Sequence, residues 1–310
     1  MPRLTPSPTW RSGLERTARS AAATLSAWSK RLAGVPGLRP VATTAGTLLV
    51  VFISRKAWQG AQFDDVSVPA LIAVAAFAVP LVLAADGAEF AIQGAMVGVH
   101  LPAVESVRQV SRANVANLLP LPGGPVLRHR VLASRGATQR GAVRAQLMTG
   151  VWWLTCGMTV TGVALIVAAD RWWIGGLGLI VGLVFGGIGW TIRPRLATAG
   201  QLALLMTVEL VKVLIGATRL WIVALLLGAK LGWLGALTTA FSTPAAAALG
   251  IFPSGIGARE ALVGGVAGLI GADAALLFLA ATIERVVATV AMLPVLVWAM
   301  WGRSRELSAL

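Results

Sequence analysis

Seven long apolar stretches constrain the fold of this chain more than any other feature of its sequence. They cover residues 41–54, 67–85, 146–168, 174–191, 200–228, 234–252 and 274–301. A helix needs about 20 apolar residues to cross a bilayer, and most of these stretches approach or exceed that length. The chain is 57% hydrophobic and only 12% charged, so in water much apolar surface would stay uncovered. We therefore expect an all-α integral membrane protein, with residues 40–301 as a polytopic membrane domain.

The distribution of charge predicts how these stretches are oriented. The formal net charge is +14, and the cytoplasmic loops of membrane proteins are enriched in Lys and Arg. The basic regions are residues 1–39, 126–145, 192–196 and 302–310, whereas acidic residues lie at 64–65 and at 170. We expect the basic regions on the cytoplasmic side of a bacterial plasma membrane. Both termini are then cytoplasmic, and 302–310 is a short tail.

Residues 1–39 form a separate basic segment before the first apolar stretch. Its apolar side chains recur at steps of three and four, which places them on one face of a helix. These side chains are Trp10, Leu14, Ala18, Ala21, Leu25, Trp28 and Leu32. We expect a basic amphipathic helix that lies on the inner leaflet. The alternative is a partly disordered tail.

The predicted orientation requires that residues 234–271 return to the side from which they enter. Stretch 200–228 begins at the cytoplasmic side, and stretch 274–301 ends there. The residues between them must therefore make no net crossing. Pro253, Gly255 and Gly257 provide a bend, so we expect a re-entrant hairpin that enters from outside.

The same argument applies to residues 88–119, which lie between a stretch that ends inside and the basic loop 126–145. We expect a second hairpin, entering from the cytoplasm and ending near residues 119–124. The whole fold then has about six spanning helices and two re-entrant helical hairpins, a pattern similar to the inverted halves of transporters. The alternative is eight ordinary spans.

Ionisable residues inside the apolar stretches are candidate functional residues. Each costs about 2.5–3.5 kcal/mol at the centre of a membrane helix, so it faces the bundle interior or a wet cavity. Glu209, Lys212 and Arg219 form a polar stripe on stretch 200–228, and Glu284 and Arg285 lie near the middle of the last stretch. The alternatives are structural ion pairs, and for Glu209 and Lys212 a position near the cytoplasmic end.

Gly178, Gly182 and Gly186 recur at four-residue steps in stretch 174–191. Small residues at this spacing allow two helices to approach closely. We expect packing rather than a binding site here, either inside the chain or at the contact between two copies.

The composition also excludes several classes of function. One Cys and two His cannot form an intramolecular disulfide or a His/Cys zinc cluster. The sequence has no P-loop and no Gly-x-Ser-x-Gly elbow, and it has no basic soluble domain to bind nucleic acid. We therefore expect no enzymatic activity, no metal, no cofactor and no nucleic-acid partner.

Two segments together resemble a known family. The first is Asn117-Leu118-Leu119-Pro120 with Gly124 and Arg128. It is similar to the Asn-x-x-x-Pro-x-x-x-Gly-acid-x-x-Arg segment of the lysylphosphatidylglycerol synthase/flippase transmembrane family, although Pro125 replaces the acid. The second runs from Pro253 to Glu260 and resembles the family's Pro-x-Gly-hydrophobic-Gly-x-x-Glu signature. The resemblance covers roughly residues 40–300 and implies a stand-alone membrane domain, without the soluble aminoacyl-transferring domain.

The family resemblance implies translocation of a lipid between leaflets. The substrate would be an anionic phospholipid, an aminoacyl phospholipid, a glycolipid or a polyprenyl-phosphate-linked sugar. We expect Arg128 and Arg130 to hold a phosphate at the cytoplasmic mouth, with Gly123 and Gly124 allowing close backbone approach. The full set of expected substrate-binding residues is Asn117, Pro120, Gly123, Gly124, Arg128, Arg130, Glu209, Arg219, Pro253, Gly255, Gly257, Arg259, Glu260, Glu284 and Arg285.

A second hypothesis places the chain in another class. It would be a non-transporting membrane subunit that scaffolds an envelope-lipid biosynthetic enzyme. The expected partners are the membrane and a lipid with a phosphate or sugar headgroup, and either a second copy of the chain or a partner synthase.

Overall fold

The computed structural model describes residues 51–52, 55, 67–117, 123–249 and 257–307. Of these residues, 84% are helical and none lies in a strand, which confirms the all-α prediction. The helices are α3 (Val68–Met96), α4 (Ala103–Ala116), α5 (Gly123–Ser134), α6 (Gln139–Ala169), α7 (Trp172–Ile192), α8 (Ala199–Leu226), α9 (Trp233–Leu237), α10 (Ser242–Leu249), α11 (Ala258–Leu269) and α12 (Ala274–Leu307). The amphipathic segment expected at 1–39 lies outside the described residues, as does most of stretch 41–54.

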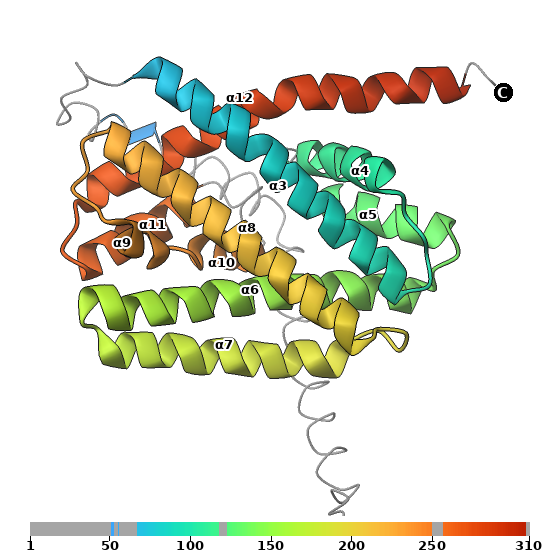
Figure 1. Cartoon of the computed structure of the whole chain (residues 1–310), viewed down its shortest axis with the longest axis horizontal. Coiled ribbons are helices and arrows are strands. Elements are labelled where there is room, and N and C mark those ends of the chain that lie inside the picture. Colours follow the sequence, from blue (N-terminus) through green and yellow to red (C-terminus); the bar gives the residue numbers. More distant parts are fainter. Residues whose placement is uncertain (1–50, 53–54, 56–66, 118–122, 250–256, 308–310) are drawn as a thin grey trace, which may run out of the picture.

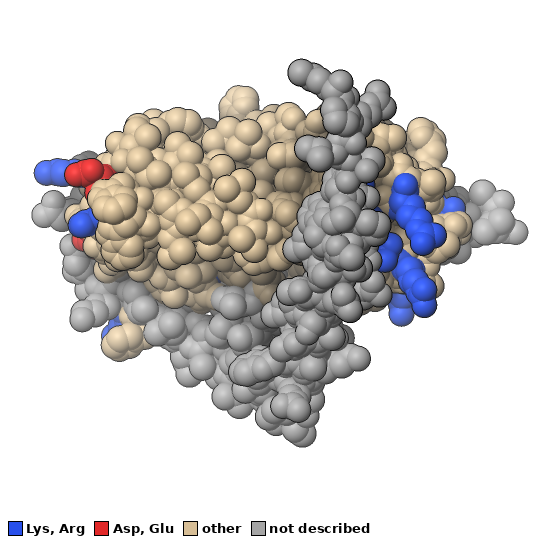
Figure 2. Space-filling view, turned by 90° about the horizontal axis from the view of Figure 1, so that it is seen from below, with Lys and Arg blue, Asp and Glu red and all other residues tan. Residues whose placement is uncertain are grey.

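Four of the described helices are long and apolar enough to cross a membrane: Pro69–Met96, Gln139–Ala169, Trp172–Ile192 and Ala274–Ala299. Helix α7 has 21 residues and is about 31 Å long, which matches a hydrocarbon core of about 30 Å. In Figure 2 the middle of the described surface is uncharged, and Lys and Arg gather at the end where α7 ends. These features indicate a membrane protein whose long helices run between the two charged ends.

Three of the long helices begin at a hydroxyl side chain. Ser67, Thr138 and Thr198 are the N-caps of α3, α6 and α8, and each accepts a hydrogen bond from a backbone N–H of the first turn. At α8 the side chain of Gln201 also accepts from the Thr198 N–H, which completes a capping box. Such caps satisfy N–H groups that would otherwise lack partners at a helix start.

Helix α8 crosses the front of the molecule in Figure 1 and contacts α3, α6, α9 and α12. Helices α3 and α8 lie side by side, and α6 and α7 form an antiparallel pair next to them. The ends of α3, α7 and α12 point to the same end of the molecule, and α6 and α8 begin there. The described parts of the basic regions, 126–145, 192–196 and 302–307, therefore lie at one end of the fold.

The glycine face of α7 packs inside the chain. A Cβ atom on Gly175 would lie 2.5 Å from the backbone oxygen of Gly162 on α6, and one on Gly182 would lie 2.8 Å from Thr159 Oγ1. Gly178 and Gly182 are both buried. Of the two roles predicted for this face, the structure shows the internal one.

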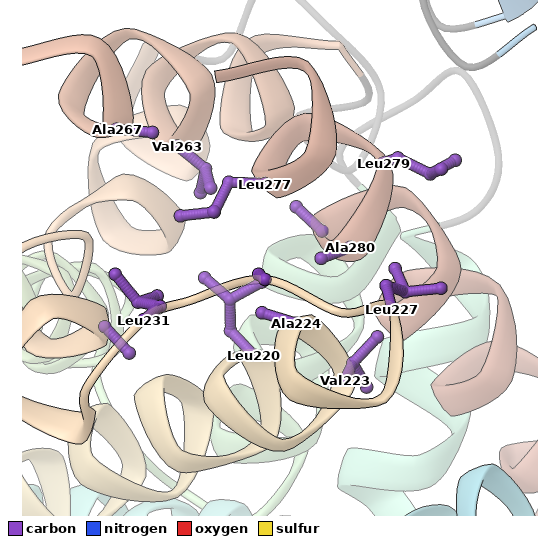
Figure 3. Close-up of a cluster of buried hydrophobic side chains, with 13 residues drawn as sticks. Leu220, Val223, Ala224, Leu227, Leu231, Val263, Ala267, Leu277, Leu279 and Ala280 are labelled. Atoms are coloured by element: carbon purple, nitrogen blue, oxygen red, sulfur yellow. The ribbon is translucent and has the colours of Figure 1, made fainter. Parts of the chain in front are cut away.

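The largest apolar cluster joins α8 to the C-terminal part of the chain (Figure 3). Leu220, Val223 and Leu227 meet Val263 of α11 and Leu277 of α12, all buried. This packing fixes α11 and the first half of α12 against α8, and these three helices carry one half of the site described below.

The hairpin predicted at residues 88–119 has wrong boundaries. Helix α3 does not end near residue 85 but continues through Asp86 and Gly87 to Met96. The charged side chains do not end the helix because they are buried in ion pairs with other helices, and Gly87 is covered by Val107 of α4. The helix pair that follows is α4–α5, so part of the predicted loop 126–145 is helical.

The two groups of short helices occupy opposite halves of the molecule. In Figure 1, α4 and α5 lie toward the end where α3 ends, and α9, α10 and α11 lie toward the end where α8 ends. Helix α4 is attached to α12 by Arg112, whose Nη2 donates to the Ala299 carbonyl oxygen at 2.7 Å.

Candidate functional site

A cavity of about 850 Å³ lies among the helices and is lined by charged side chains. A cavity of this size can hold a drug-sized ligand or a lipid headgroup. Its carboxylates are Asp86, Glu89, Glu209 and Glu284, and its cations are Arg128, Lys212, Arg219, Arg259 and Arg285. We distinguish an acidic end, formed by Asp86, Glu89, Arg128, Glu209 and Lys212, from a basic end, formed by Arg219, Arg259, Glu260, Glu284 and Arg285.

Lys212 of α8 is the centre of the acidic end. Its Nζ contacts Asp86 Oδ1 at 3.0 Å and Glu209 Oε2 at 3.3 Å, and it forms a close ion pair with Glu89. Arg128 of α5 approaches the same Glu89 at 2.7 Å. Two cations from two helices therefore bind one carboxylate of α3.

Amide side chains complete the hydrogen bonding of the α3 carboxylates. Asn114 Nδ2 donates to Asp86 Oδ2 at 3.2 Å. Gln93 Nε2 donates both to Glu89 Oε1 at 2.8 Å and to Thr149 Oγ1 at 2.9 Å. These contacts draw on α3, α4 and α6, so the acidic end lies where these helices meet α5 and α8.

The first sequence motif positions Arg128. The Gly124 N–H donates to Asn117 Oδ1 at 3.0 Å, which joins the start of α5 to the end of α4. A Cβ on Gly124 would lie 2.3 Å from that oxygen, and one on Gly123 would lie 2.6 Å from the Ala116 backbone oxygen. The two glycines thus permit close approach to α4, and Arg128 follows one turn after Gly124.

The basic end contains two groups of ion pairs. Glu284 of α12 binds Arg259 Nη1 of α11 at 2.6 Å and also pairs with Arg219 of α8. Arg285 Nε lies 2.8 Å from Glu260 Oε1. Glu260 is 1% exposed and Glu284 is 3% exposed, so both carboxylates are removed from water.

The second motif positions Arg259 and Glu260. Gly257 has φ +84°, a conformation that side-chain-bearing residues rarely adopt. Its N–H donates to Glu260 Oε2 at 2.8 Å, so this carboxylate caps α11 while its other oxygen faces Arg285. The turn places Arg259 at the start of α11, within reach of Glu284.

Several side chains at the cavity, among them Gln93, Gln146, Glu209 and Arg259, have buried polar atoms without a hydrogen-bond partner among the described residues. Both carboxylate oxygens of Glu209 and the side-chain oxygen of Gln93 accept no hydrogen bond, and Nε of Arg259 donates none. The acidic end therefore offers free acceptors and the basic end a free donor. Unmet groups of this kind are costly in a low-dielectric interior and indicate places for a ligand or water.

The structure brings together most of the site residues that the sequence predicts. Arg128, Glu209, Arg219, Arg259, Glu284 and Arg285 line one cavity, with Asn117 and Gly124 beside them. Arg130 is exposed and does not line the cavity, because it follows Arg128 by two residues on the helix and faces away. Pro120, Pro253 and Gly255 lie outside the described residues.

Sequence reasoning did not assign Asp86, Glu89 and Gln93 to the site. They are spaced three and four residues apart in an apolar run, which puts them on one face of α3. This spacing of three polar residues in an apolar run is the sequence feature that indicates a shared polar face.

No family model matches the chain, and no curated protein is similar to it in sequence. The family resemblance therefore stays a prediction that rests on the motif residues.

Proposed function

We propose that the protein moves lipids with phosphate-containing headgroups between the two leaflets of a membrane, and that the charged cavity binds the headgroup. The observation that carries this proposal is a cavity of about 850 Å³ with nine charged side chains inside a bundle of apolar helices. Ionisable groups at membrane depth are expensive, and they mark substrate or ion pathways more often than packing sites.

A headgroup crosses hydrocarbon slowly because its polar groups lose their hydrogen bonds with water. The cavity supplies replacements for those bonds. At the basic end, Arg219, Arg259 and Arg285 face two carboxylates, which leaves one cation in excess and Arg259 Nε free to donate. Guanidinium groups bind phosphate oxygens through paired hydrogen bonds, so we assign the phosphate to this end.

We also propose that α4–α5 and α10–α11 are re-entrant hairpins that enter from opposite sides. Their positions in opposite halves of the molecule support this, as do the lengths of α10 and α11, which have 8 and 12 residues and are too short to span. Each hairpin carries a glycine turn followed by an arginine that reaches a glutamate on a long helix. This arrangement resembles the broken helices at the substrate sites of transporters.

The test is lipid movement in vesicles that contain the purified protein. Phosphatidylglycerol with a fluorescent acyl chain reports transfer through its access to a membrane-impermeant quencher. We expect faster transfer than in protein-free vesicles and its loss in Arg259→Gln/Glu284→Gln, which removes both members of one ion pair. Arg144→Gln is the matched control, because Arg144 is exposed on α6 and does not line the cavity. Equal transfer with and without protein would refute the proposal.

The alternative is a non-transporting subunit that supports an envelope-lipid enzyme. The observation that favours it is the extent of internal pairing: Glu284 already binds two arginines, and Glu89 binds Arg128 and Lys212. Internal pairs of this kind also occur in purely structural roles. Stable co-purification with one synthase, together with no lipid transfer by the protein alone, would support this alternative.

A further inference from the structure

Glu209 differs from every other carboxylate at the cavity. It lies on α8, is 0% exposed and lines the cavity, yet neither of its oxygens accepts a hydrogen bond from a described residue. Lys212 Nζ lies 3.3 Å from Glu209 Oε2, farther than its 3.0 Å contact with Asp86. Glu209 is therefore the least satisfied acid in the site.

The charges around Glu209 do not balance. Among the described residues of the acidic end, three carboxylates face two cations. Arg128 and Lys212 both bind Glu89, and Lys212 also binds Asp86. One negative charge is left over, and it falls on Glu209 because Asp86 and Glu89 hold the closer contacts.

Other ionisable groups near Glu209 do not supply the missing positive charge. The helices packed against α8 bring Asp86 and Glu89 from α3 and the buried thiol of Cys156 from α6. Toward α12, Arg219 is already paired with Glu284. The described residues also contain no group of three or more His, Cys, Asp or Glu side chains that could hold a metal ion. The smallest cation that meets the need is a proton.

We propose that Glu209 reversibly binds a proton, and that this step couples lipid movement to a proton gradient. The coupling rests on the function proposed above, whereas the proton binding does not. The carboxylate takes up one proton to form a neutral carboxylic acid, which balances three acids against two cations. The new hydroxyl is a donor, and the side-chain oxygen of Gln93, which also lines the cavity, is an acceptor without a donor. Release of the proton restores the charge on Glu209 and its attraction to Lys212.

Proton binding can be tested without any lipid substrate. Infrared difference spectra recorded between two pH values show the carbonyl stretch of carboxylic acids that gain a proton. We expect such a band in the wild type, its loss in Glu209→Gln and its presence in Glu105→Gln. Glu105 is a matched control because it lies on α4 outside the cavity lining and pairs with Arg135 near the surface. An unchanged band in a folded Glu209→Gln protein would overturn the proposal.

Coupling requires a second measurement in the lipid-transfer vesicles. We expect an imposed pH gradient to change the transfer rate of labelled phosphatidylglycerol in the wild type, and its reversal to change the rate in the opposite direction. Glu209→Gln should lose this dependence and Glu105→Gln should keep it. A pH-sensitive dye inside wild-type vesicles should report proton movement during transfer, which tests the coupling even if the Glu209 variant does not fold.

The outcomes separate the two proposals. Transfer that ignores the gradient in the wild type would overturn the coupling while leaving lipid transfer established. No transfer under any condition would refute the proposed function, and the infrared band would still decide whether Glu209 binds a proton.

Discussion

The two ends of the cavity are built from similar parts but carry opposite surpluses of charge. Each has a glycine turn followed by an arginine, a glutamate on a long helix and a cation from α8. The acidic end has an excess carboxylate at Glu209, and the basic end has one more cation than carboxylate. Lys212 and Arg219 are seven residues apart on α8, so the two ends are separated by about 10 Å along that helix.

The excess carboxylate of the acidic end and the excess cation of the basic end respond differently to burial in an apolar environment. A carboxylate without a partner can become neutral by taking up a proton. A guanidinium keeps its charge at any ordinary pH. On the proposal above, the acidic end changes its charge with pH, whereas the basic end keeps its excess positive charge.

The largest expected effect follows from breaking the basic end. Glu284→Ala leaves Arg219 and Arg259 without their shared carboxylate. Removing one member of a buried ion pair costs about 3–5 kcal/mol, and neither arginine can lose its charge to reduce that cost. We expect a loss of this size in the free energy of unfolding in detergent. Glu105→Ala, outside the cavity, is the control, and a similar small loss in both variants would contradict the buried pairing.

The matching change at the acidic end is Lys212→Met. It leaves Asp86, Glu89 and Glu209 with Arg128 as their remaining cation in the site. We expect a smaller loss at neutral pH, about 2–3 kcal/mol, because a carboxylate can take up a proton. As the pH falls, protonation removes the unpaired charge, so the deficit relative to the wild type should shrink. Glu284→Ala should show no such recovery as the pH falls. If the loss in the free energy of unfolding depended on pH equally in both variants, the expected difference between the two ends would be wrong.

The sequence predicts most of the fold but not the partners within the site. Apolar length predicts the long helices α6, α7 and α12, which are long and apolar enough to cross a membrane, because this feature depends on local composition. The break expected near residue 85 was wrong because Asp86 and Glu89 are stabilised by Arg128 and Lys212. Those contacts join residues far apart in the chain, and no local pattern reports them.

The two sequence motifs are limited in the same way: they indicate charged residues but not the residues with which these pair. The spacing of Asn117 to Arg128 and of Gly257 to Glu260 indicates two turns with charged residues after them. Among the described residues, Asn117 accepts a hydrogen bond from the Gly124 N–H, and Glu260 accepts one from the Gly257 N–H. That Arg128 reaches α3 and Arg259 reaches α12 depends on helix packing. The motifs therefore identify the site residues, and the tertiary structure decides their pairing.

The two glycine turns allow a finer comparison, since they need glycine for different reasons. Gly257 has φ +84°, and holding alanine in such a conformation costs about 1–3 kcal/mol. We expect Gly257→Ala to lower the free energy of unfolding by this amount and to weaken Glu260 as the cap of α11. Gly176→Ala, in helix α7 with open space around it, should have no destabilising effect. A Gly257→Ala protein as stable as the wild type would show that the turn is not strained.

Position 124 instead requires glycine because the Asn117 side chain lies close to it. Substitution here has the smallest expected effect on the free energy of unfolding. A Cβ at this position would lie 2.3 Å from Asn117 Oδ1, at the end of a short side chain that can move away. Moving it breaks the hydrogen bond from the Gly124 N–H, so Gly124→Ala should cost about 1 kcal/mol. Asn117→Ala removes the same hydrogen bond together with the clash. The double variant should therefore be no less stable than Asn117→Ala alone, because two changes that remove one interaction are not additive. Additive losses in the double variant would mean that Gly124 contacts something other than Asn117 at the start of α5.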